Sequence, residues 1–279
     1  MKRSMVISAS QAGGRLDRTL EALLPDLGLR ARRRLAETGR VFLDGKPCGP
    51  ARKVRAGELL EIVDAVRERD AEPEGSGCIA LVRQGDFAAV CKPAGLHSVS
   101  LAGGGGPSVE ALLPGLFPGE CPRLLNRLDQ GTSGLLLVGF SADAGARFRE
   151  LEAAGRVEKE YRAVAAGTVC AATLKNRLDT ADRKRTRVLG EADPDPARWT
   201  RVEPLEPFPG TADPATLLRV VIQRGARHQI RAHLAGIGHA LLGDALYEGP
   251  PAARLHLHHR RIRFETGQGL FEVVDEVCW

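Results

Sequence analysis

A polar and charged segment at residues 64–77 divides the chain into two parts with different sequence patterns. The segment reads DAVRERDAEPEGSG, and this density of charge with proline and glycine is typical of a linker. The whole chain has 279 residues, whereas single domains commonly hold about 100–200. We therefore expect a small domain at residues 12–63, a linker at 64–77 and a larger domain at 78–279.

The composition indicates folded domains and favours a polyanionic partner. Hydrophobic residues make up 43% of the chain and charged residues 27%, so each domain can bury a core. The net charge of +5 is small, so clustering of basic residues matters more than the total. One cluster lies at residues 30–34 and another at 183–187, and each suits either a phosphate backbone or an ordinary solvated face.

Several classes of protein lack support in the sequence. The six cysteines show no CxxC spacing that would seat zinc, so we expect no metal site. No run of eighteen apolar residues and no secretion signal occurs, which favours a cytoplasmic protein without a membrane. Phosphate-binding and dinucleotide-binding glycine motifs are also missing, so we expect no cofactor.

The first part of the chain predicts two helices followed by a hairpin. Leucines at helical spacing predict a helix over residues 16–24, and a basic helix follows at 30–37. Strands are predicted at residues 41–46 and 54–62, the first with an Asp-Gly turn. The order RLD, basic helix, glycine turn and final VRAGE strand resembles the RNA-binding domain of small-subunit ribosomal protein four. This resemblance implies that the basic helix contacts RNA.

In the second part, one aspartate stands out as a candidate nucleophile. The triplet Arg-Leu-Asp occurs three times, but only the copy ending at Asp129 leads into QGTSG and then an apolar strand at residues 135–138. Such a turn beside a buried strand is a rigid place for a catalytic group. Arg127 and the backbone donors of the turn would keep the carboxylate ionised. The alternative is an aspartate that only satisfies its own turn.

Four ordered blocks resemble the RluA-type pseudouridine synthases. They are AVCKPAGL at 89–96, NRLDQGTSGLLL at 126–137, KEYRAV at 159–164, and RGARHQIRAHL at 224–234 with GHALLGD at 238–244. The resemblance implies an α+β fold with a mixed, mainly antiparallel β-sheet. It also implies isomerisation of uridine to pseudouridine, with Asp129 as nucleophile, Tyr161 against the base and assisting proton removal, and Arg231 paired with the aspartate.

The resemblance further implies RNA as the partner, with large-subunit ribosomal RNA favoured and transfer RNA as an alternative, and we expect a monomer. The chain departs from the family at Asn126, where histidine is usual, and at Arg224, where Thr-Gly-Arg has become Arg-Gly-Ala-Arg. Histidines elsewhere lack the companions of a metal site, so we expect structural or RNA-contacting roles for them. The expected RNA contacts are Arg30, Arg32, Arg33, Arg34, Lys92, Arg127, Arg224 and His228.

Two other functions remain as alternatives. A non-catalytic RNA-binding or ribosome-assembly protein on the same fold would have no need of Asp129, Tyr161 and Arg231, all of which are present. A glycoside hydrolase would need a second acid close to Asp129. The nearest candidate within a motif is Asp244, and nothing in the sequence places it within reach. Residues 193–214 are rich in proline and predict a long surface loop.

Overall fold

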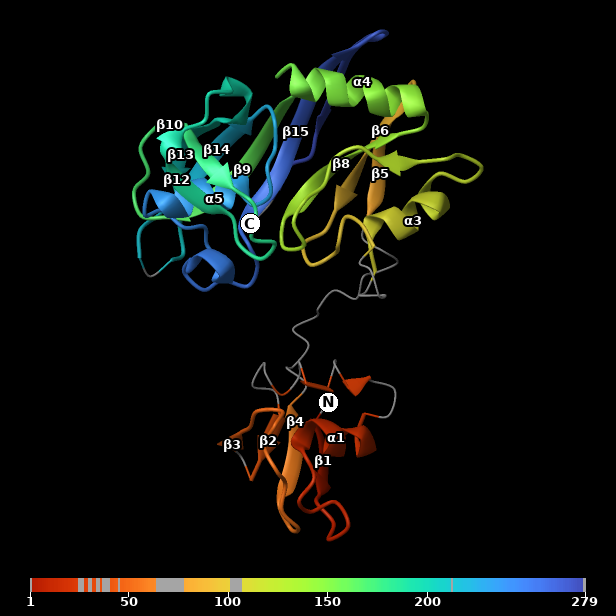
Figure 1. Cartoon of the computed structure of the whole chain (residues 1–279), viewed down its shortest axis with the longest axis vertical. Coiled ribbons are helices and arrows are strands. Elements are labelled where there is room, and N and C mark those ends of the chain that lie inside the picture. Colours follow the sequence, from red (N-terminus) through yellow and green to blue (C-terminus); the bar gives the residue numbers. More distant parts are fainter. Residues whose placement is uncertain are drawn as a thin grey trace. The chain divides into compact units, whose positions relative to one another are not determined.

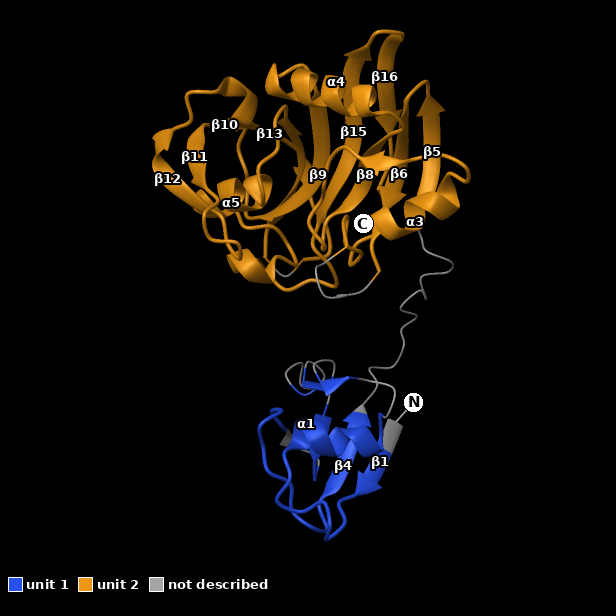
Figure 2. Cartoon of the chain, turned by 45° about the vertical axis from the view of Figure 1, so that its right-hand side comes forward, with its two compact units in different colours: residues 1–75 blue, residues 76–279 orange. Residues whose placement is uncertain are grey.

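The structure, a computed structural model, consists of two compact units, Met1–Gly75 and Ser76–Trp279 (Figures 1 and 2). It describes residues 2–24, 28–29, 32–33, 36, 41–44, 46–63, 78–100, 107–211 and 213–277. The linker predicted at 64–77 lies outside the described residues. Each unit has its own hydrophobic core.

The small unit is built on a four-stranded antiparallel sheet in the order β1-β4-β2-β3. Its strands are β1 (Lys2–Val6), β2 (Val41–Leu43), β3 (Lys46–Pro47) and β4 (Leu59–Val63). Helix α1 (Leu16–Thr19) continues into the 3₁₀-helix η1 (Leu20–Ala22). Leu16 and Leu20 pack with Val41, Leu60 and Ile62 in the core.

The small unit differs from its predicted pattern in three ways. Strand β1 was not predicted, and its pairing with β4 makes the unit begin before the expected residue 12. The first helix is shorter than predicted because the chain tightens to 3₁₀ geometry at Leu20. The last strand begins at Leu59 rather than at residue 54, since Gly57 forms a turn with φ +88° and donates its N–H to Ile7.

In the large unit, ten of the described strands form one sheet in the order β10-β13-β14-β9-β15-β8-β6-β5, with β16 beside β15 and β7 beside β8. Strands β15 and β8 run parallel, and the other pairs are antiparallel. The predicted mixed, mainly antiparallel α+β fold is therefore confirmed. The strands are β5 (Ile79–Gln84), β6 (Phe87–Lys92), β7 (Arg123–Leu124), β8 (Ser133–Gly139), β9 (Glu158–Ala166), β10 (Ala172–Leu174), β13 (Thr200–Pro207), β14 (Ala215–Ile222), β15 (Leu257–Thr266) and β16 (Gly269–Val274).

Helices pack against this sheet in two hydrophobic clusters. Helix α4 (Ala142–Ala153) packs through Phe148 and Leu151 on β8, β15 and β16. Helices α3 (Val109–Leu116) and α5 (Gln229–Gly236) belong to the other cluster, with β9 and β14. Serine hydroxyls cap the N-termini of α3 and α4 by accepting backbone N–H bonds. No described helix has the length and apolarity needed to cross a membrane.

One segment that the sequence marked as a loop contains a strand, and the third Arg-Leu-Asp copy lies in a strand of its own. The third Arg-Leu-Asp copy lies in β11 (Asn176–Asp179), which forms a hairpin with β12 (Arg187–Ala192). The proline-rich stretch at residues 193–214 contains η2 (Pro196–Arg198) and all of β13, so the prediction of a long surface loop was wrong. Strand β13 is stabilised by pairing with β14, which local proline content does not register.

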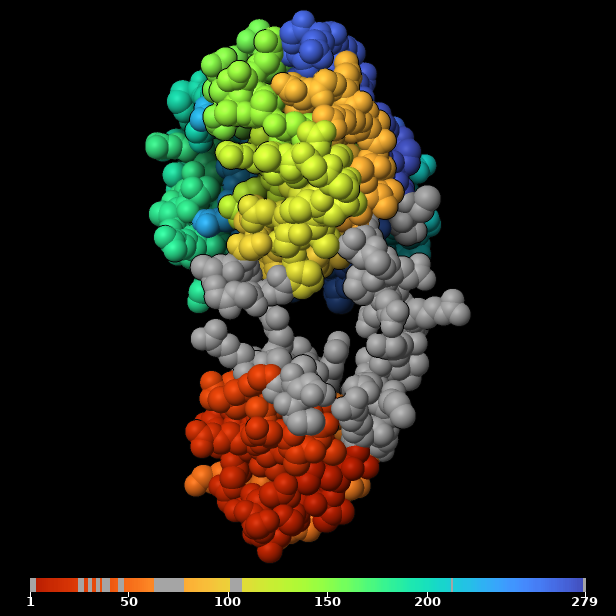
Figure 3. Space-filling model, turned by 90° about the vertical axis from the view of Figure 1, so that its right-hand side faces the viewer, coloured from red at the N-terminus to blue at the C-terminus, as the bar shows by residue number. Residues whose placement is uncertain are grey.

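Two places in the sheet differ in their packing: the edge strand β5, and the contact between β8 and β15 at the centre. Figure 3 shows the edge strand β5, in orange, beside α3 on the surface of the large unit. At the centre, the parallel contact between β8 and β15 depends on Gly134, whose φ is +106°. A Cβ atom there would lie 2.4 Å from the carbonyl oxygen of His259. Glycine is therefore required where the two strands meet.

Candidate active site

Asp129 lies in the turn between β7 and β8, and neighbouring groups fix the backbone on both sides of it. The Thr132 N–H donates to the Asp129 carbonyl at 3.1 Å. The Ser98 hydroxyl donates to the Leu128 carbonyl at 2.8 Å and accepts from the Leu128 N–H at 3.0 Å. Upstream, Asn126 Oδ1 accepts the N–H of Leu137 at 2.7 Å. The asparagine that replaces the family's histidine thus ties this segment to β8.

Lys92 links the turn of the AVCKPAGL block to the loop that carries Asp129. Its side chain is fully buried, and its ammonium group donates to the carbonyls of Pro93, Leu96 and Gln130 at 2.7–3.1 Å. Burial lowers the pKa of Lys92 to about 8. All three donors of the ammonium group are used within the protein. The prediction that Lys92 contacts RNA is therefore wrong, and the side chain instead holds the turn at residues 93–96 against the Asp129 loop.

Arg231 holds two carboxylates with one guanidinium group. Its Nη1 lies 2.8 Å from Asp129 Oδ2, and its Nε and Nη2 each lie 2.7 Å from an oxygen of Asp244. Burial opposes the charge on Arg231, but the hydrogen bonds to Asp244 and Asp129 outweigh it and raise the pKa of the guanidinium group. The predicted pairing of Arg231 with Asp129 is thus present, and Asp244 fixes the other edge of the guanidinium.

Asp244 is within reach of the site, which nothing in the sequence had indicated. It is 1% exposed and also accepts the backbone N–H groups of Leu246 and Tyr247 at the start of η3 (Ala245–Tyr247). Both of its oxygens are therefore bound within the protein. An acid for glycoside hydrolysis has to exchange a proton with the substrate, so Asp244 does not fit that role.

The free part of Asp129 faces a pocket. Its side chain is 25% exposed, and among the described residues its Oδ1 has no hydrogen-bond partner. His228 Nε2 lies 3.8 Å from Oδ2. His228 precedes α5 in the left-handed conformation, with φ 55°, which is unusual outside glycine. Burial lowers the pKa of His228, which favours the neutral imidazole.

Tyr161 lines the same pocket from β9. Its ring is 6% exposed and stacks on His259 of the neighbouring strand β15, with centroids 4.6 Å apart and planes at 18°. Burial, and then the negative charges of Asp129 and Glu152, raise the pKa of the Tyr161 hydroxyl above its ordinary value. The phenol is consequently neutral at physiological pH. Within the described residues its hydroxyl forms no hydrogen bond.

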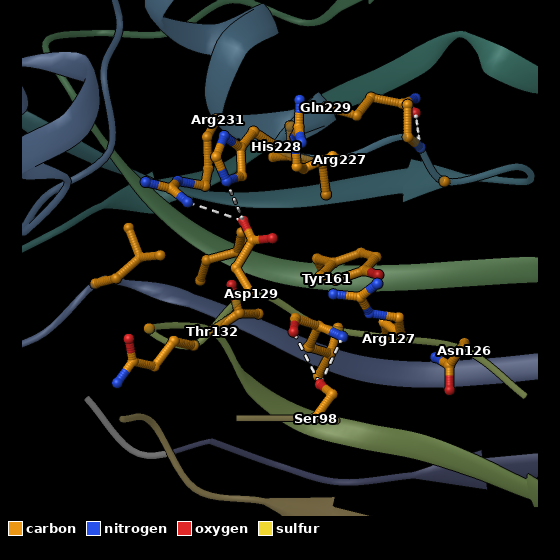
Figure 4. A pocket seen from close by; sticks show the side chains of 18 of the residues that line it. Ser98, Asn126, Arg127, Asp129, Thr132, Tyr161, Arg227, His228, Gln229 and Arg231 are labelled. Atoms are coloured by element: carbon orange, nitrogen blue, oxygen red, sulfur yellow. Dashed lines mark hydrogen bonds and ion pairs between the residues drawn. The ribbon is translucent and has the colours of Figure 1, made fainter. Parts of the chain in front are cut away.

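The pocket itself has a volume of about 840 Å³. Figure 4 shows Arg231 and His228 on one side of the Asp129 carboxylate, with Tyr161 and Arg127 on the other. Among the described residues, no three His, Cys, Asp or Glu side chains are arranged to hold a metal ion. The site therefore offers an anchored carboxylate with one free oxygen, a neutral phenol and a surrounding of positive charge.

Comparison with known proteins identifies the family. The family model described as RNA pseudouridylate synthase matches residues 86–236, which is more than half of the chain. The chain belongs to this family. It is thus an RNA-modifying isomerase that converts uridine to pseudouridine, and the family resemblance found in the sequence is confirmed. Asp129, Tyr161 and Arg231 fall inside the matched span, and Asp244 falls outside it.

Curated relatives and solved structures agree with this membership. Ribosomal large subunit pseudouridine synthase D of Yersinia pestis is 33% identical over 256 residues, which cover 89% of this chain and 77% of that protein. The protein of the same name from Escherichia coli K12 is 32% identical, covering 88% and 76%. The structure of human RNA pseudouridylate synthase domain containing 1 has a TM-score of 0.61 and 24% identity, covering 72% and 83%, and shows the same fold.

The predicted RNA contacts lie in different environments. Arg127 and His228 line the pocket, whereas Arg224 does not and instead pairs with Asp195 at 3.4 Å. Arg227 occupies the pocket wall in its place. Among the described residues, the exposed guanidinium of Arg127 has no hydrogen-bond or ion-pair partner.

The arginine helix of the small unit is partly committed to internal contacts. Arg30 and Arg34 lie outside the described residues. Arg32 is 7% exposed and pairs with Glu21 at 3.1 Å, and its contact with RNA stays a prediction. Arg33 is half exposed and donates from Nε to the buried Asp17 at 2.7 Å. Hydrogen bonding to Arg15 first, and then to Arg33, lowers the pKa of Asp17 to about 2.

Two functional contacts had not been predicted. Ser98 gave no signal, because a serine two residues after the KPAGL block resembles any loop serine. Asp244 was visible as the end of the GHALLGD block, but its partner was not.

Proposed function

We propose that Asp129 is the nucleophile of the uridine isomerisation and that Arg231 holds it in place. The proposal rests chiefly on one observation: Arg231 binds one oxygen of Asp129 and leaves the other free in the pocket. A charge-assisted hydrogen bond keeps the carboxylate ionised and oriented. Because Asp244 takes the remaining edge of Arg231, the guanidinium cannot rotate away from Asp129.

Tyr161 has a different role in this proposal. The reaction breaks the bond from C1′ to N1 of uracil, forms a bond from C1′ to C5, removes the proton from C5 and adds one at N1. A neutral phenol is a weak base, so Tyr161 accepts the C5 proton only while its own hydroxyl proton passes on to N1, the atom that gains a proton in the reaction. We assign this proton relay to Tyr161, with the tyrosine ring lying along the target base.

The substrate class follows from the relatives. The curated proteins named above carry the name of ribosomal large subunit pseudouridine synthase D, so we infer large-subunit ribosomal RNA as the substrate here. A pocket of about 840 Å³ accommodates a nucleotide that has left its helix, as base-modifying enzymes require. Arg127 at the pocket wall then meets a phosphate next to the target uridine.

The β11–β12 hairpin extends this RNA surface. Its tip carries Arg183, Lys184 and Arg185, and it is fastened to the pocket wall. Arg227 donates to the carbonyls of Thr180 and Asp182, and Tyr247 exchanges hydrogen bonds with the backbone of Thr186. A basic tip held next to the pocket suits the phosphates that flank the target nucleotide.

The small unit serves as an additional RNA anchor in the same proposal. Its support is the sequence resemblance to the ribosomal RNA-binding domain and the exposed part of Arg33. Since its core shares no residue with the clusters of the large unit, residues 78–279 fold without it. Compared with the full chain, residues 78–279 alone are expected to bind RNA with lower affinity, and their binding is expected to depend less steeply on salt. Equal RNA affinity and an equal salt slope for the full chain and for residues 78–279 would show that the small unit is not an RNA anchor.

Replacing Asp129 with asparagine tests the catalytic assignment. Pseudouridine formation is measured site by site in ribosomal RNA and transfer RNA transcripts, and RNA binding is measured in parallel. Asp129→Asn is expected to bind RNA like the wild type and to form no pseudouridine, since an amide keeps the shape but not the nucleophilicity. Wild-type turnover by this variant would refute the assignment, and modification of transfer RNA alone would refute the substrate class.

A further inference from the structure

His259 has no place in the reaction so far, yet like Val220 it lies directly opposite Tyr161 on a neighbouring strand. Tyr161 and His259 are paired across β9 and β15, so their side chains project from the same side of the sheet. Their rings stack at 4.6 Å. His259 does not line the pocket, whereas Tyr161 does, so the imidazole lies behind the phenol as seen from the pocket.

The imidazole is held rigidly. His259 is fully buried, and its Nδ1 lies 2.6 Å from the carbonyl oxygen of Leu135 in β8. A carbonyl only accepts hydrogen bonds, so Nδ1 carries the proton and the tautomer is fixed. The backbone of His259 is equally confined, because Gly134 leaves no room between β8 and β15.

His259 contacts both Tyr161 and β8, the strand that follows the Asp129 turn. Strand β8 begins at Ser133, directly after the Asp129 turn, and its Leu135 carbonyl accepts the hydrogen bond from the imidazole. One face of that imidazole supports Tyr161, whose hydroxyl has no partner among the described residues. The Nε2 atom of His259 is buried and likewise lacks a partner in the described part of the chain. Stacking on Tyr161 and the hydrogen bond to Leu135 are the contacts that position the imidazole.

We propose that His259 is a positioning residue that sets the ring plane of Tyr161 relative to Asp129. The inference rests on the proposed function of Tyr161. The flat imidazole acts as a stop behind the phenol, so that the Tyr161 hydroxyl stays at the base when RNA enters. The stack, rather than the hydrogen bond to Leu135, carries the effect on turnover.

Three variants separate the parts of this contact. His259→Phe keeps a flat ring and loses the donor to Leu135, His259→Asn keeps a donor and loses the ring, and His259→Leu loses both. We expect turnover close to wild type for His259→Phe, and a kcat lower by about tenfold to a hundredfold for the other two with KM unchanged. His256→Leu is the matched control, because His256 also binds a carbonyl through Nδ1 but contacts Phe208 rather than Tyr161.

A spectroscopic measurement shows whether the ring of Tyr161 responds. The chain has only two tyrosines, so 3-fluorotyrosine gives two ¹⁹F NMR signals, with Tyr247 as the internal reference. The Tyr161 signal is expected to shift in His259→Asn and His259→Leu and to remain near its original position in His256→Leu. Thermal unfolding of each variant identifies any that do not fold, and His259→Phe against His259→Asn remains a valid comparison without His259→Leu.

The outcomes separate this inference from the proposed function. An active His259→Asn together with an inactive His259→Phe would overturn the inference, since the hydrogen bond would then matter and the stack would not. Unchanged turnover in all three variants would overturn it as well, provided that Asp129→Asn and Tyr161→Phe are inactive on the same RNA. If Asp129→Asn or Tyr161→Phe keeps full activity, the proposed function fails instead.

Discussion

The Ser98 hydroxyl both donates to and accepts from the backbone of Leu128, the residue immediately before Asp129. Ser98 is 3% exposed, so neither bond is replaced by water when the hydroxyl is removed. One side chain thus fixes the peptide that carries the candidate nucleophile.

Ser98→Ala is expected to lower the free energy of unfolding by about 1–3 kcal/mol and to lower turnover as well, because both backbone groups lose their partner. Urea unfolding and single-turnover pseudouridine formation measure the two effects. Ser141→Ala is the control, since it removes the cap of α4 at a cost of about 1 kcal/mol without contacting the pocket. Loss of turnover in both variants alike would indicate a general effect of stability.

Asp244→Asn is expected to damage both stability and catalysis. The amide leaves the buried Arg231 with only Asp129 as its charged partner, and breaking one side of a buried ion pair costs about 3–5 kcal/mol. We expect kcat to fall while RNA affinity is kept, since Asp244 faces Arg231 rather than solvent. Steady-state kinetics with a parallel binding assay test this. A rise in KM at unchanged kcat would argue that Asp244 acts through RNA binding.

The salt dependence of RNA binding distinguishes Lys92 from Arg127. Lys92→Met is expected to leave the slope of log K against log[salt] unchanged, because its ammonium group is buried against carbonyls. Arg127→Ala is expected to reduce the slope by about 0.7–0.9, the share of one phosphate contact. Arg263→Ala, an exposed position outside the pocket, is the control. A reduced slope for Lys92→Met would restore it as an RNA contact.

The stability of the large unit is expected to fall as the pH is lowered from about 6.5 towards 3. Burial lowers the pKa of His259 to about 3 from an ordinary 6.5, so only the unfolded chain binds the proton in this window. The contribution is fully present above pH 6.5 and declines by at most about 1.4 kcal/mol per pH unit below it. His259→Phe removes this part of the slope. Urea unfolding monitored by tryptophan fluorescence reports on the large unit, which holds both tryptophans; equal slopes for the two proteins would contradict the prediction.

Sequence patterns predicted the centre of the large unit well. The apolar run after the Asp129 turn is the fully buried β8, and the block around Tyr161 is β9. These strands are recognisable because their own residues carry the burial pattern. The proximity of Asp129, Tyr161 and Arg231 was implied by the family resemblance alone, since nothing local joins residues so far apart.

The features that sequence patterns missed depend on distant partners. Strand β1 is stabilised by pairing with β4, which lies more than fifty residues later in the chain. Lys92 resembled a surface cation because its acceptors are backbone carbonyls, which have no residue type to recognise. Asp244 was dismissed since its distance to Asp129 is set by one shared guanidinium rather than by spacing.

The left-handed backbone of His228 lowers stability at a position where the side chain lines the active-site pocket. A non-glycine residue held at φ 55° costs roughly 1 kcal/mol or more, and this residue lies 3.8 Å from the carboxylate of Asp129. Glycine would adopt the same conformation without strain but would remove the imidazole from the pocket wall. A library selected only for resistance to unfolding would therefore drift towards glycine at this position, whereas one selected for pseudouridine formation would retain the histidine.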